Sequence, residues 1–572
     1  MVDELIRSGV SDAVLAPGSR STPLAIAFAE AERDERITLH VRLDERSAGY
    51  LGLGLAKVTG VPTVVLTTSG TAAVNLHPAL VEADESGVPL IALTADRPGA
   101  LRDVGANQAI TQAALFADAV RFAVDMDVAA EKPGMVRYWR STVARVVAFA
   151  TEAGNPGPVH VNAPFAEPLV PDGNDGWVES LDGRPEGRPW TADARLVAGM
   201  STPLDDVLDS LLGDGTVPAR GLLIVGDHDD PEAVEMIDEL GDTLGWPVIG
   251  EPSGNAAGSD TALSHGTLLL ADEAFAADHV ADLVITVGRV GLSRSVLRAV
   301  AQAGLHIAVD SRPRWSDPTR TAAIVLTSVP LPPEAAEIDE SWLESWQRAD
   351  VLAAAAVETV LGHHGDALTG IHAARVAAAA VPDGGLFFVG PSSAVRHVAS
   401  FASNTVQDAV ILGNRGTSGI DGCVSTAWGA AFALQRAGGA GAIALLGDQT
   451  FIYDSNGLLA PAEEERPDLV IVVADNDGGG IFSTLEQGAA EFEPVFERVF
   501  GVPLGVEIAR ACQAADVPCQ AATTSAELAS AIDDALGAGG VRVVVASVIE
   551  REPEAALLTA VQAAVADALE SA

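Results

Sequence analysis

Two polar residues that follow successive apolar runs could together hold a metal-bound phosphate. Asp448 follows the run 441–446, and Asn476, 28 positions after Asp448, follows the run 469–474. Two buried strands joined by a crossover would place both residues at the carboxyl edge of one parallel sheet, where open α/β sheets bind ligands. Carboxylate, amide and backbone carbonyl oxygens suit a hard cation, and Mg²⁺ takes further oxygens from substrate phosphates. The spacing therefore predicts a diphosphate held through a metal ion.

The bulk composition narrows the function classes. A formal charge of −45 over 572 residues argues against nucleic acid, whose phosphates need a basic face, and against an anionic membrane surface. The three cysteines have no CxxC spacing and indicate neither a disulfide framework nor a zinc site. No long uncharged apolar stretch or signal peptide is evident, so we expect a cytoplasmic protein. Val2, Leu5 and Ile6 have helical spacing without a preceding cap, which predicts a native start upstream of Met1.

Strands and helices alternate along most of the chain. This alternation predicts an α/β protein of three doubly wound parallel-sheet domains, over residues 1–180, 190–345 and 352–572, with a Pro- and Gly-rich linker at 168–192. The expected strands are 12–16, 38–41, 63–67, 90–94, 159–162, 221–225, 283–287, 306–309, 323–327, 386–389, 410–412, 443–446, 469–473 and 541–547.

Three strand-to-helix junctions carry residues suited to a cofactor. Glu45 could be an ordinary helix-start carboxylate, or a lone carboxylate held against a cofactor ring nitrogen. Ser69-Gly70-Thr71 could be a tight turn, or a place where a flat ring approaches the backbone. The segment 414–422 is denser in Gly, Ser and Thr than a connector requires, which favours a phosphate-binding nest.

Several arginines lie in or just beyond strand-to-helix loops, on the side where ligands bind. A solvated arginine is the ordinary interpretation of any one of them, but several in equivalent positions of a very acidic chain indicate substrates with more than one carboxylate. They are Arg20, Arg97, Arg294, Arg396 and Arg415. We find no HExxH, GxSxG, Walker lysine loop or GxGxxG opening a βαβ unit.

Eight segments, in order along the chain, together resemble one family of thiamine-diphosphate enzymes, the 2-succinyl-5-enolpyruvyl-6-hydroxy-3-cyclohexene-1-carboxylate synthases of menaquinone biosynthesis. The segments are APGSRSTPL (16–24), LDERSAGYLGLGLAKV (43–58), TSGTAAVNLHPALVEA (68–83), LTADRPGALRDVGANQAI (93–110), VHVNAPFAEPL (159–169), NRGTSGIDGCVSTAWG (414–429), GDQTFIYDSNGLL (447–459) and DNDGGGIFSTLEQ (475–487). The middle of the chain matches weakly, through LGWPVIGE (244–251).

The resemblance implies roles for individual residues. Glu45 would be the catalytic carboxylate that activates the cofactor, and Asp448, Asn476 and the carbonyl of Gly478 would hold Mg²⁺ or Mn²⁺. The implied thiamine-diphosphate contacts are Ser69, Gly70, Ser418, Ile420, Gly447, Asp448 and Asn476. The implied substrate contacts are Ser19, Arg20, Arg97, Gln108, Arg294, Ser392, Arg396, Arg415, Ile481, Phe482 and Leu485. Two departures are Arg294-Ser295, where some relatives have two basic residues, and the acidic Asp475-Asn476-Asp477, where relatives often have asparagines.

The resemblance also implies the reaction. A transferase of this family decarboxylates 2-oxoglutarate on thiamine diphosphate and adds the remaining succinyl unit to isochorismate. It further implies a homodimer or dimer of dimers, with Glu45 and Asp448 of one site supplied by different chains. The rivals are another thiamine-dependent 2-oxo-acid lyase or acetohydroxy-acid synthase, against which the arginines argue, and a non-catalytic relative, against which Glu45, Asp448 and Asn476 argue.

Overall fold

The computed structural model describes residues 1–171, 176–191, 202–212, 215–228, 230, 232–312, 314–333, 337–406 and 408–571. The chain divides into two compact units. The first comprises Met1–Val197, Asn414–Gly439 and Tyr453–Pro467, and the second comprises Ala198–Gly413, Ala440–Ile452 and Asp468–Ala572. Two segments from the C-terminal third therefore belong with the N-terminal part of the chain.

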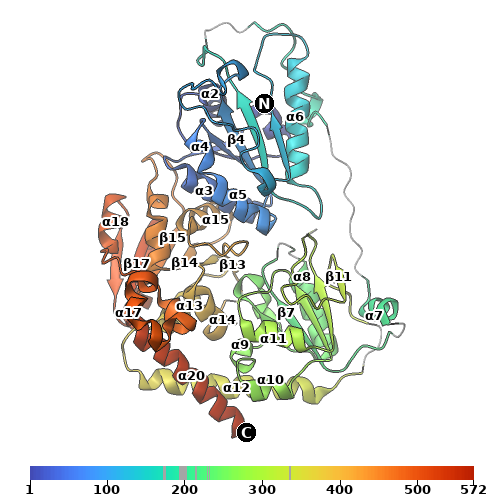
Figure 1. The fold of residues 1–572 in the computed structure, drawn as a ribbon, viewed down its shortest axis with the longest axis vertical. Coiled ribbons are helices and arrows are strands. Elements are labelled where there is room, and N and C mark those ends of the chain that lie inside the picture. The colour runs from blue at the N-terminus through green and yellow to red at the C-terminus, as the bar shows by residue number, and fades with distance from the viewer. Residues whose placement is uncertain are drawn as a thin grey trace. The chain divides into compact units, whose positions relative to one another are not determined.

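The first unit contains a parallel sheet, in which β4 is labelled in Figure 1. Among the described residues this sheet has six strands, in the order β2-β1-β3-β4-β6-β5. Its strands are β1 (Asp12–Leu15), β2 (Thr38–Val41), β3 (Thr63–Thr67), β4 (Leu90–Asp96), β5 (Phe122–Asp125) and β6 (Val159–Pro164). Its helices are α1 (Val2–Arg7), α2 (Thr22–Arg33), α3 (Glu45–Thr59), α4 (Thr71–Val74), α5 (His77–Ser86), α6 (Met135–Ala150) and α15 (Cys423–Arg436).

Helices cover both faces of this sheet. Successive side chains of a strand point to opposite faces, so neighbouring strand residues contact different helices. Ala13 and Val64 pack in one apolar cluster with Phe28 of α2 and Val143 of α6. Helix α3 packs against Val65, one position further along β3, and therefore on the opposite face. Near-continuous apolar strands of this kind are what a doubly covered parallel sheet requires.

The second unit contains two further parallel sheets. Among the described residues, one has five strands in the order β11-β10-β9-β7-β8: β7 (Gly221–Val225), β8 (Val248–Gly250), β9 (Leu283–Val287), β10 (Leu305–Val309) and β11 (Ile324–Leu326). Its helices are α7 (Leu204–Leu212), α8 (Ala233–Leu244), α9 (Gly266–Leu269), α10 (Glu273–Asp278), α11 (Arg294–Gln302) and α12 (Glu340–His363). Trp342 and Trp346 anchor α12 to the core of this sheet.

The other sheet of the second unit has six strands among the described residues, in the order β13-β12-β14-β15-β17-β16. They are β12 (Leu386–Val389), β13 (Val410–Leu412), β14 (Ala442–Gly447), β15 (Leu469–Asp475), β16 (Cys519–Ala522) and β17 (Val541–Ser547). The helices in this part of the chain, after α12 and besides α15, are α13 (Gly370–Ala379), α14 (Ser393–Phe401), α16 (Asp448–Tyr453), α17 (Glu493–Phe496), α18 (Ile508–Ala514), α19 (Ser525–Ala538) and α20 (Arg551–Glu570). Counted within each sheet, the order second-first-third-fourth-sixth-fifth is the same as in the first unit.

The prediction of three doubly wound parallel sheets is confirmed, and every expected strand is present with ends shifted by at most two residues. Three strands were not expected, namely β5, β8 and β16. Each of them lies at an edge of its sheet. An edge strand has a neighbour on one side only and needs no continuous apolar run; β5 alternates half-buried and exposed residues.

The linker expected at 168–192 lies partly outside the described residues, at 172–175 and 192. A described part of it is bound to the first unit, because Glu179 accepts backbone hydrogen bonds of 2.9 Å from Gly134 and from Val136 at the start of α6. The domain boundaries given above stay predictions. No helix among the described residues is both long and apolar enough to cross a lipid bilayer.

Candidate functional site

Asp448 and Asn476 lie at the carboxyl ends of neighbouring strands, as their spacing predicts. Strands β14 and β15 pair in parallel, with Gly447 opposite Ala474. Asp448 follows β14 directly and begins α16, and Asn476 follows β15 directly. The two side chains therefore share one edge of the sheet.

Acidic side chains gather at this edge, and the Arg551 guanidinium there donates to the backbone carbonyls of Asn476 and Asp477. Burial raises the pKa of Asp448 to about 6, and the nearby carboxylates of Asp475 and Asp477 act in the same direction, against backbone hydrogen bonds from Gln449 and Gly478. Burial and Asp477 likewise raise the pKa of Asp475. Burial and neighbouring acids disfavour the ionised form of a carboxylate, and a bound cation stabilises that form. The electrostatics therefore fit a divalent metal ion at Asp448.

The amide of Asn476 offers a second oxygen. Its Oδ1 is buried and accepts no hydrogen bond from the described residues. Leaving such an oxygen unpaired costs about 1–3 kcal/mol, which a bound ligand would offset. The Gly478 amide donates to Asp448 Oδ2 over 2.7 Å, and the Gly478 carbonyl accepts from Gly480 over 2.9 Å, so one lone pair of that carbonyl is left for a metal.

The donor set itself is consistent with such an ion. Among the described residues no group of three or more His, Cys, Asp and Glu side chains is arranged to hold a metal. The expected set needs none, because it combines one carboxylate with an amide and a backbone oxygen, and Mg²⁺ completes its shell with phosphate and water. The residues at this edge thus fit a metal-bound diphosphate.

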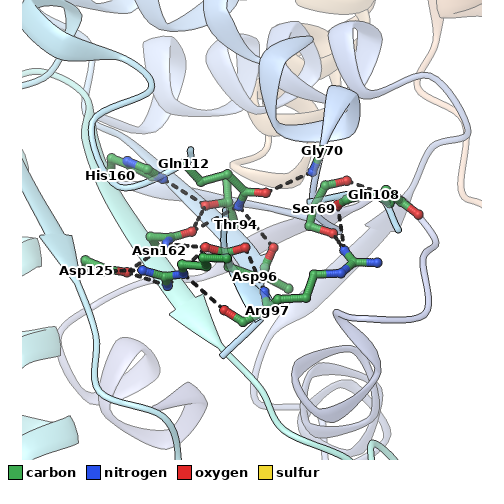
Figure 2. A network of polar contacts seen from close by, with 12 residues as sticks. Ser69, Gly70, Thr94, Asp96, Arg97, Gln108, Gln112, Asp125, His160 and Asn162 are labelled. Carbon is green, nitrogen blue, oxygen red and sulfur yellow. Dashed lines mark hydrogen bonds and ion pairs between the residues drawn. The ribbon is translucent and has the colours of Figure 1, made fainter. Parts of the chain in front are cut away.

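The carboxyl edge of the first sheet brings two of the expected substrate residues, Arg97 and Gln108, beside Ser69 and Gly70 (Figure 2). Arg97, which follows β4, donates to Ser69 Oγ and to the Gln108 carbonyl, the latter over 2.8 Å. Gln108 Nε2 donates to the Ser69 carbonyl over 2.9 Å. Gly70 has φ +81°, and a Cβ there would lie 2.9 Å from Gln108 Cγ, so the turn admits only glycine. These residues form one contiguous surface.

Arg20 and Arg97 bring two positive charges to this edge. Both are buried, at 9% and 7% exposure. Burial and the like charge of Arg20 lower the pKa of Arg97. Arg20 is held by the Phe165 carbonyl at 3.0 Å, and its nearest carboxylate, Glu167, is an exposed group 3.6 Å away. Two neighbouring buried guanidinium groups favour a bound carboxylate. Ser19, between β1 and Arg20, is exposed beside them.

A buried polar network supports this surface from below, and sequence reasoning missed it. Gln112 accepts from the Gly70 amide over 2.8 Å and donates to Asn162 over 3.0 Å. Asn162 in turn donates to Asp96 and Asp125 over 2.9 and 2.8 Å, and Thr94 bonds both Asn162 and His160 (Figure 2). Polar residues inside apolar strands were the available signal, because buried polar groups need partners.

Glu45 is the first residue of α3, after the N-cap Asp44, which accepts from the Arg46 amide over 2.9 Å. Its side chain is half-buried, and no hydrogen bond or ion pair from another described residue is made to its carboxylate. The carboxylate is therefore available to a ligand. The structure is also compatible with the plain helix-start interpretation, since an acidic residue in the first turn complements the helix dipole.

The helix that carries Glu45 is fixed by glycines and by one buried acid. A Cβ on Gly54 of α3 would lie 2.1 Å from the Thr426 carbonyl of α15, so the two backbones touch. Asp454, fully buried, accepts from Ser47 Oγ over 3.3 Å and from the Ser425 amide over 2.8 Å. Burial raises the pKa of Asp454 to about 6. Asp454 thus joins the starts of α3 and α15, and it too escaped prediction.

The Gly-rich loop before α15 carries three expected residues, Arg415, Ser418 and Ile420. Arg415 and Ile420 are half-buried and Ser418 is exposed, with φ +56°. No hydrogen bond or ion pair from another described residue is made to the Arg415 guanidinium. At the end of the loop, Asp421 accepts from Tyr50 of α3 over 2.6 Å. The hydrogen bond to Asp421 thus fixes the loop next to Ile420, and the Arg415 guanidinium is available to bind a ligand.

The remaining expected residues lie in the second unit. Ser392, at the N-cap of α14, has φ +69°, a strained value for serine, and its carbonyl accepts from Arg396 over 2.8 Å. Ile481, Phe482 and Leu485 are half-buried, on or beside a 3-10 turn. Arg294 is 81% exposed and pairs with Glu486, next to Leu485, at 2.5 Å. These positions are compatible with the expected roles and do not test them.

Two parts of the chain match known protein domains. Residues 1–115 match the model of the thiamine pyrophosphate enzyme N-terminal TPP binding domain, and residues 389–546 match the C-terminal TPP binding domain. Thiamine pyrophosphate is another name for thiamine diphosphate.

Three curated relatives cover most of the chain, and all three are named 2-succinyl-5-enolpyruvyl-6-hydroxy-3-cyclohexene-1-carboxylate synthase. The Thermobifida fusca protein is 44% identical over 100% of this chain and 98% of its own length. The Saccharopolyspora erythraea protein is 43% identical over 90% and 89%, and the Kineococcus radiotolerans protein 41% identical over 93% and 92%. The resemblance seen in the eight motifs is confirmed along nearly the whole length. The chain therefore belongs to the 2-succinyl-5-enolpyruvyl-6-hydroxy-3-cyclohexene-1-carboxylate synthase family of thiamine-pyrophosphate enzymes.

Proposed function

We propose that this chain is a thiamine-diphosphate-dependent transferase that decarboxylates 2-oxoglutarate and adds the succinyl unit to isochorismate. The products are 2-succinyl-5-enolpyruvyl-6-hydroxy-3-cyclohexene-1-carboxylate and carbon dioxide, in menaquinone biosynthesis. Family membership supports the reaction, because relatives that span nearly the full length bear the name of that activity.

The single structural observation that carries the proposal is the buried pair Arg20 and Arg97 beside Ser69 and Gly70. Two guanidinium groups at a cofactor-binding turn suit a substrate with a carboxylate beyond the one that is lost. Both proposed substrates are dicarboxylates. Pyruvate, with one carboxylate, would leave a buried cation without a counter-ion, which disfavours the rival 2-oxo-acid lyases.

The chain's own residues divide the work between holding and activating. When bound, thiamine diphosphate supplies the nucleophilic carbon and the electron sink for decarboxylation. Asp448, Asn476 and the Gly478 carbonyl would hold Mg²⁺ or Mn²⁺ on its diphosphate, and Gly447 and Ser418 would lie beside that group. Glu45 would share a proton with the pyrimidine ring, and Ile420 would contact the cofactor.

The substrate groups would be bound by the remaining set. Arginine forks and the neighbouring polar groups would orient the carboxylates, and an apolar wall would exclude water from the ring of the second substrate. The proposed residues are Ser19, Arg20, Arg97, Gln108, Arg294, Ser392, Arg396, Arg415, Ile481, Phe482 and Leu485.

We further propose a homodimer or dimer of dimers in which Glu45 and Asp448 of one site come from different chains. Glu45→Ala and Asp448→Ala variants, each inactive alone, should then recover activity when mixed and reassembled, because one intact site can form. A mixture that stays inactive while each variant still assembles would contradict the shared site. The cytoplasmic location expected from the sequence also stays a prediction.

The test of the reaction is carbon dioxide release from 2-oxoglutarate with thiamine diphosphate and Mg²⁺, with and without isochorismate. Isochorismate-dependent turnover to the succinyl-cyclohexene product, lost in Glu45→Gln, is the expected result. Carbon dioxide release that does not depend on isochorismate, or that is faster with pyruvate, would contradict the proposal and indicate a simpler 2-oxo-acid lyase. Bound cofactor without turnover of either acid would contradict the substrate assignment.

A further inference from the structure

Glu82 is a buried carboxylate to which the reaction gives no role. It lies in α5, 334 positions before Gly416 of the Gly-rich loop, and it is 0% exposed. Oε1 accepts from the Gly416 amide and from Ser86 Oγ, each over 2.9 Å. Oε2 accepts from the amide and the hydroxyl of Thr417, each over 2.7 Å.

These four hydrogen bonds use the full acceptor capacity of a carboxylate, which has about four lone-pair directions. Lys57 Nζ, itself largely buried, lies 4.0 Å from Oε1 and offsets the negative charge. A buried carboxylate satisfied in this way is fixed in one orientation. Glu82 is therefore a rigid anchor for two consecutive amides of the loop.

The loop is also fitted closely to this anchor. A Cβ added to Gly416 would lie 2.6 Å from Ser86 Oγ and 2.8 Å from the Glu82 carbonyl, so the backbone rests directly on α5. The residue before Gly416 is Arg415, and the residue after Thr417 is Ser418. The anchored dipeptide thus lies between an expected substrate contact and an expected cofactor contact.

We propose that Glu82 is a positioning residue that holds the loop 415–418 in the conformation that binds cofactor and substrate. This inference rests on the proposed function for the identity of the ligands, but not for the anchoring itself. No other described residue makes a hydrogen bond or ion pair to the Arg415 guanidinium, so the direction of this side chain depends on the backbone that carries it. Fixing that backbone before the ligand arrives removes an ordering cost from binding.

Glu82→Gln is the sharpest variant, because it conserves volume and replaces one acceptor oxygen by a donor NH₂. Whichever way the amide is turned, one loop amide meets a donor instead of an acceptor. Ser86→Ala is the matched control: it removes one hydrogen bond from the same carboxylate but none from the loop. Glu82→Asp, which keeps the charge on a shorter side chain, serves as the second variant if Glu82→Gln does not fold.

Three measurements on the purified full-length chain separate anchoring from general stability. They are hydrogen exchange of the 414–420 segment without cofactor, the dissociation constant of thiamine diphosphate with Mg²⁺, and the melting temperature. We expect Glu82→Gln to speed exchange of the segment and raise the dissociation constant about tenfold, the cost of one lost charge-assisted hydrogen bond. Ser86→Ala should lower the melting temperature while changing neither quantity.

If Glu82→Gln, or Glu82→Asp in its place, lowers the melting temperature but matches Ser86→Ala in exchange and cofactor affinity, Glu82 is only a packing residue and the proposal is wrong. The exchange and affinity measurements need no turnover. Failure of the wild type to use 2-oxoglutarate would therefore overturn the proposed function and leave the anchoring test intact.

Discussion

The six-stranded sheets of the first and second units have the same strand order but opposite chemistry at their carboxyl edges. In the first, β3 and β4 end in Ser69-Gly70 and Arg97, and a buried Arg20–Arg97 pair dominates the edge. In the second, the corresponding strands β14 and β15 end in Asp448 and Asn476. The fold supplies the same places in both sheets, and the side chains decide which charge each place binds.

The difference also extends beneath the surface. The first edge rests on a satisfied network of Thr94, Gln112 and Asn162, whereas the second keeps a buried acid with a raised pKa and an unpaired amide oxygen. A satisfied network makes a rigid platform for an organic ligand. An unsatisfied acidic edge is completed by an ion. The following changes would break or sharpen this contrast.

The largest effect is expected at Glu45, on the first sheet's side. Glu45→Gln should lower turnover by about 10²–10⁴-fold, the usual contribution of proton transfer by a positioned side chain. Thiamine diphosphate affinity should change little, because the contacts of the diphosphate are elsewhere. Turnover and a direct binding titration check this together. A parallel loss of affinity would mean that Glu45 is a binding residue and would remove the division of labour between the two edges.

Asp448→Asn should affect cofactor affinity, which Glu45→Gln should leave nearly unchanged. It should weaken Mg²⁺-dependent cofactor binding by roughly ten- to a hundredfold, because one charged contact to the metal is lost. The control is Asp477→Asn. Asp477 has φ +52°, which asparagine tolerates, and its Oδ1 accepts from Gly505 over 2.9 Å, as an amide oxygen can. Titration of thiamine diphosphate at several Mg²⁺ concentrations measures both variants. Equal losses would show that the acidic field, and not one ligand, binds the metal.

Arg97→Lys should raise the KM for 2-oxoglutarate about tenfold, because an ammonium cannot fork a carboxylate. Arg102→Lys is the control, since Arg102 already forks Asp125 over 2.6 and 2.9 Å. That variant should lose some thermal stability and keep the wild-type KM. Initial rates at varied 2-oxoglutarate distinguish them. An equal rise of KM in both variants would mean that the polar network beneath the edge, and not the Arg20–Arg97 pair, determines substrate binding.

The smallest effect concerns pH. Burial opposes ionisation of Asp12 in the first sheet, but hydrogen bonds from His40 and Arg436 lower the pKa of Asp12 overall. Glu554, which accepts from the Gly370 amide at the start of α13, has its pKa raised by burial to about 7. His397, 3.8 Å away, has its pKa lowered by burial to about 4 and offers no charge at neutral pH. The two buried acids therefore affect stability in different pH ranges.

Between pH 5.5 and 6.5 the folded chain keeps a proton on Glu554 that the unfolded chain has released. Stability should therefore fall as pH rises through this range, by about 1 kcal/mol from this group. Glu554→Gln, which has no proton to lose, should remove that part of the slope, whereas Asp12 stays ionised in both states and contributes none. Denaturant unfolding at the two pH values measures the difference. An unchanged slope in the variant would contradict the assignment to Glu554.

Much of the fold could be read from short stretches of sequence. The central strands are continuous apolar runs such as Val64-Val65-Leu66, because a strand covered on both faces needs them. The edge strands β5, β8 and β16 could not be found in this way. Cys519-Gln520-Ala521-Ala522 has almost no apolar signal, and its pairing with β17 is what makes it a strand.

The site residues divide in the same way, into those that local motifs reveal and those that depend on contacts between distant parts of the chain. Asp448, Asn476 and Arg97 directly follow strands, and Glu45 begins the helix after β2, so local sequence was sufficient to place each at a strand-to-helix junction. Glu82 and Gly416 are 334 positions apart, and nothing local to either residue indicates the other. Periodicity and turn chemistry act over a few residues, so the sequence by itself determined the strands and the chemistry at their ends. Only the tertiary structure decided which buried polar groups satisfy one another, because hydrogen bonding depends on atoms brought within about 3 Å by the packing of the whole chain.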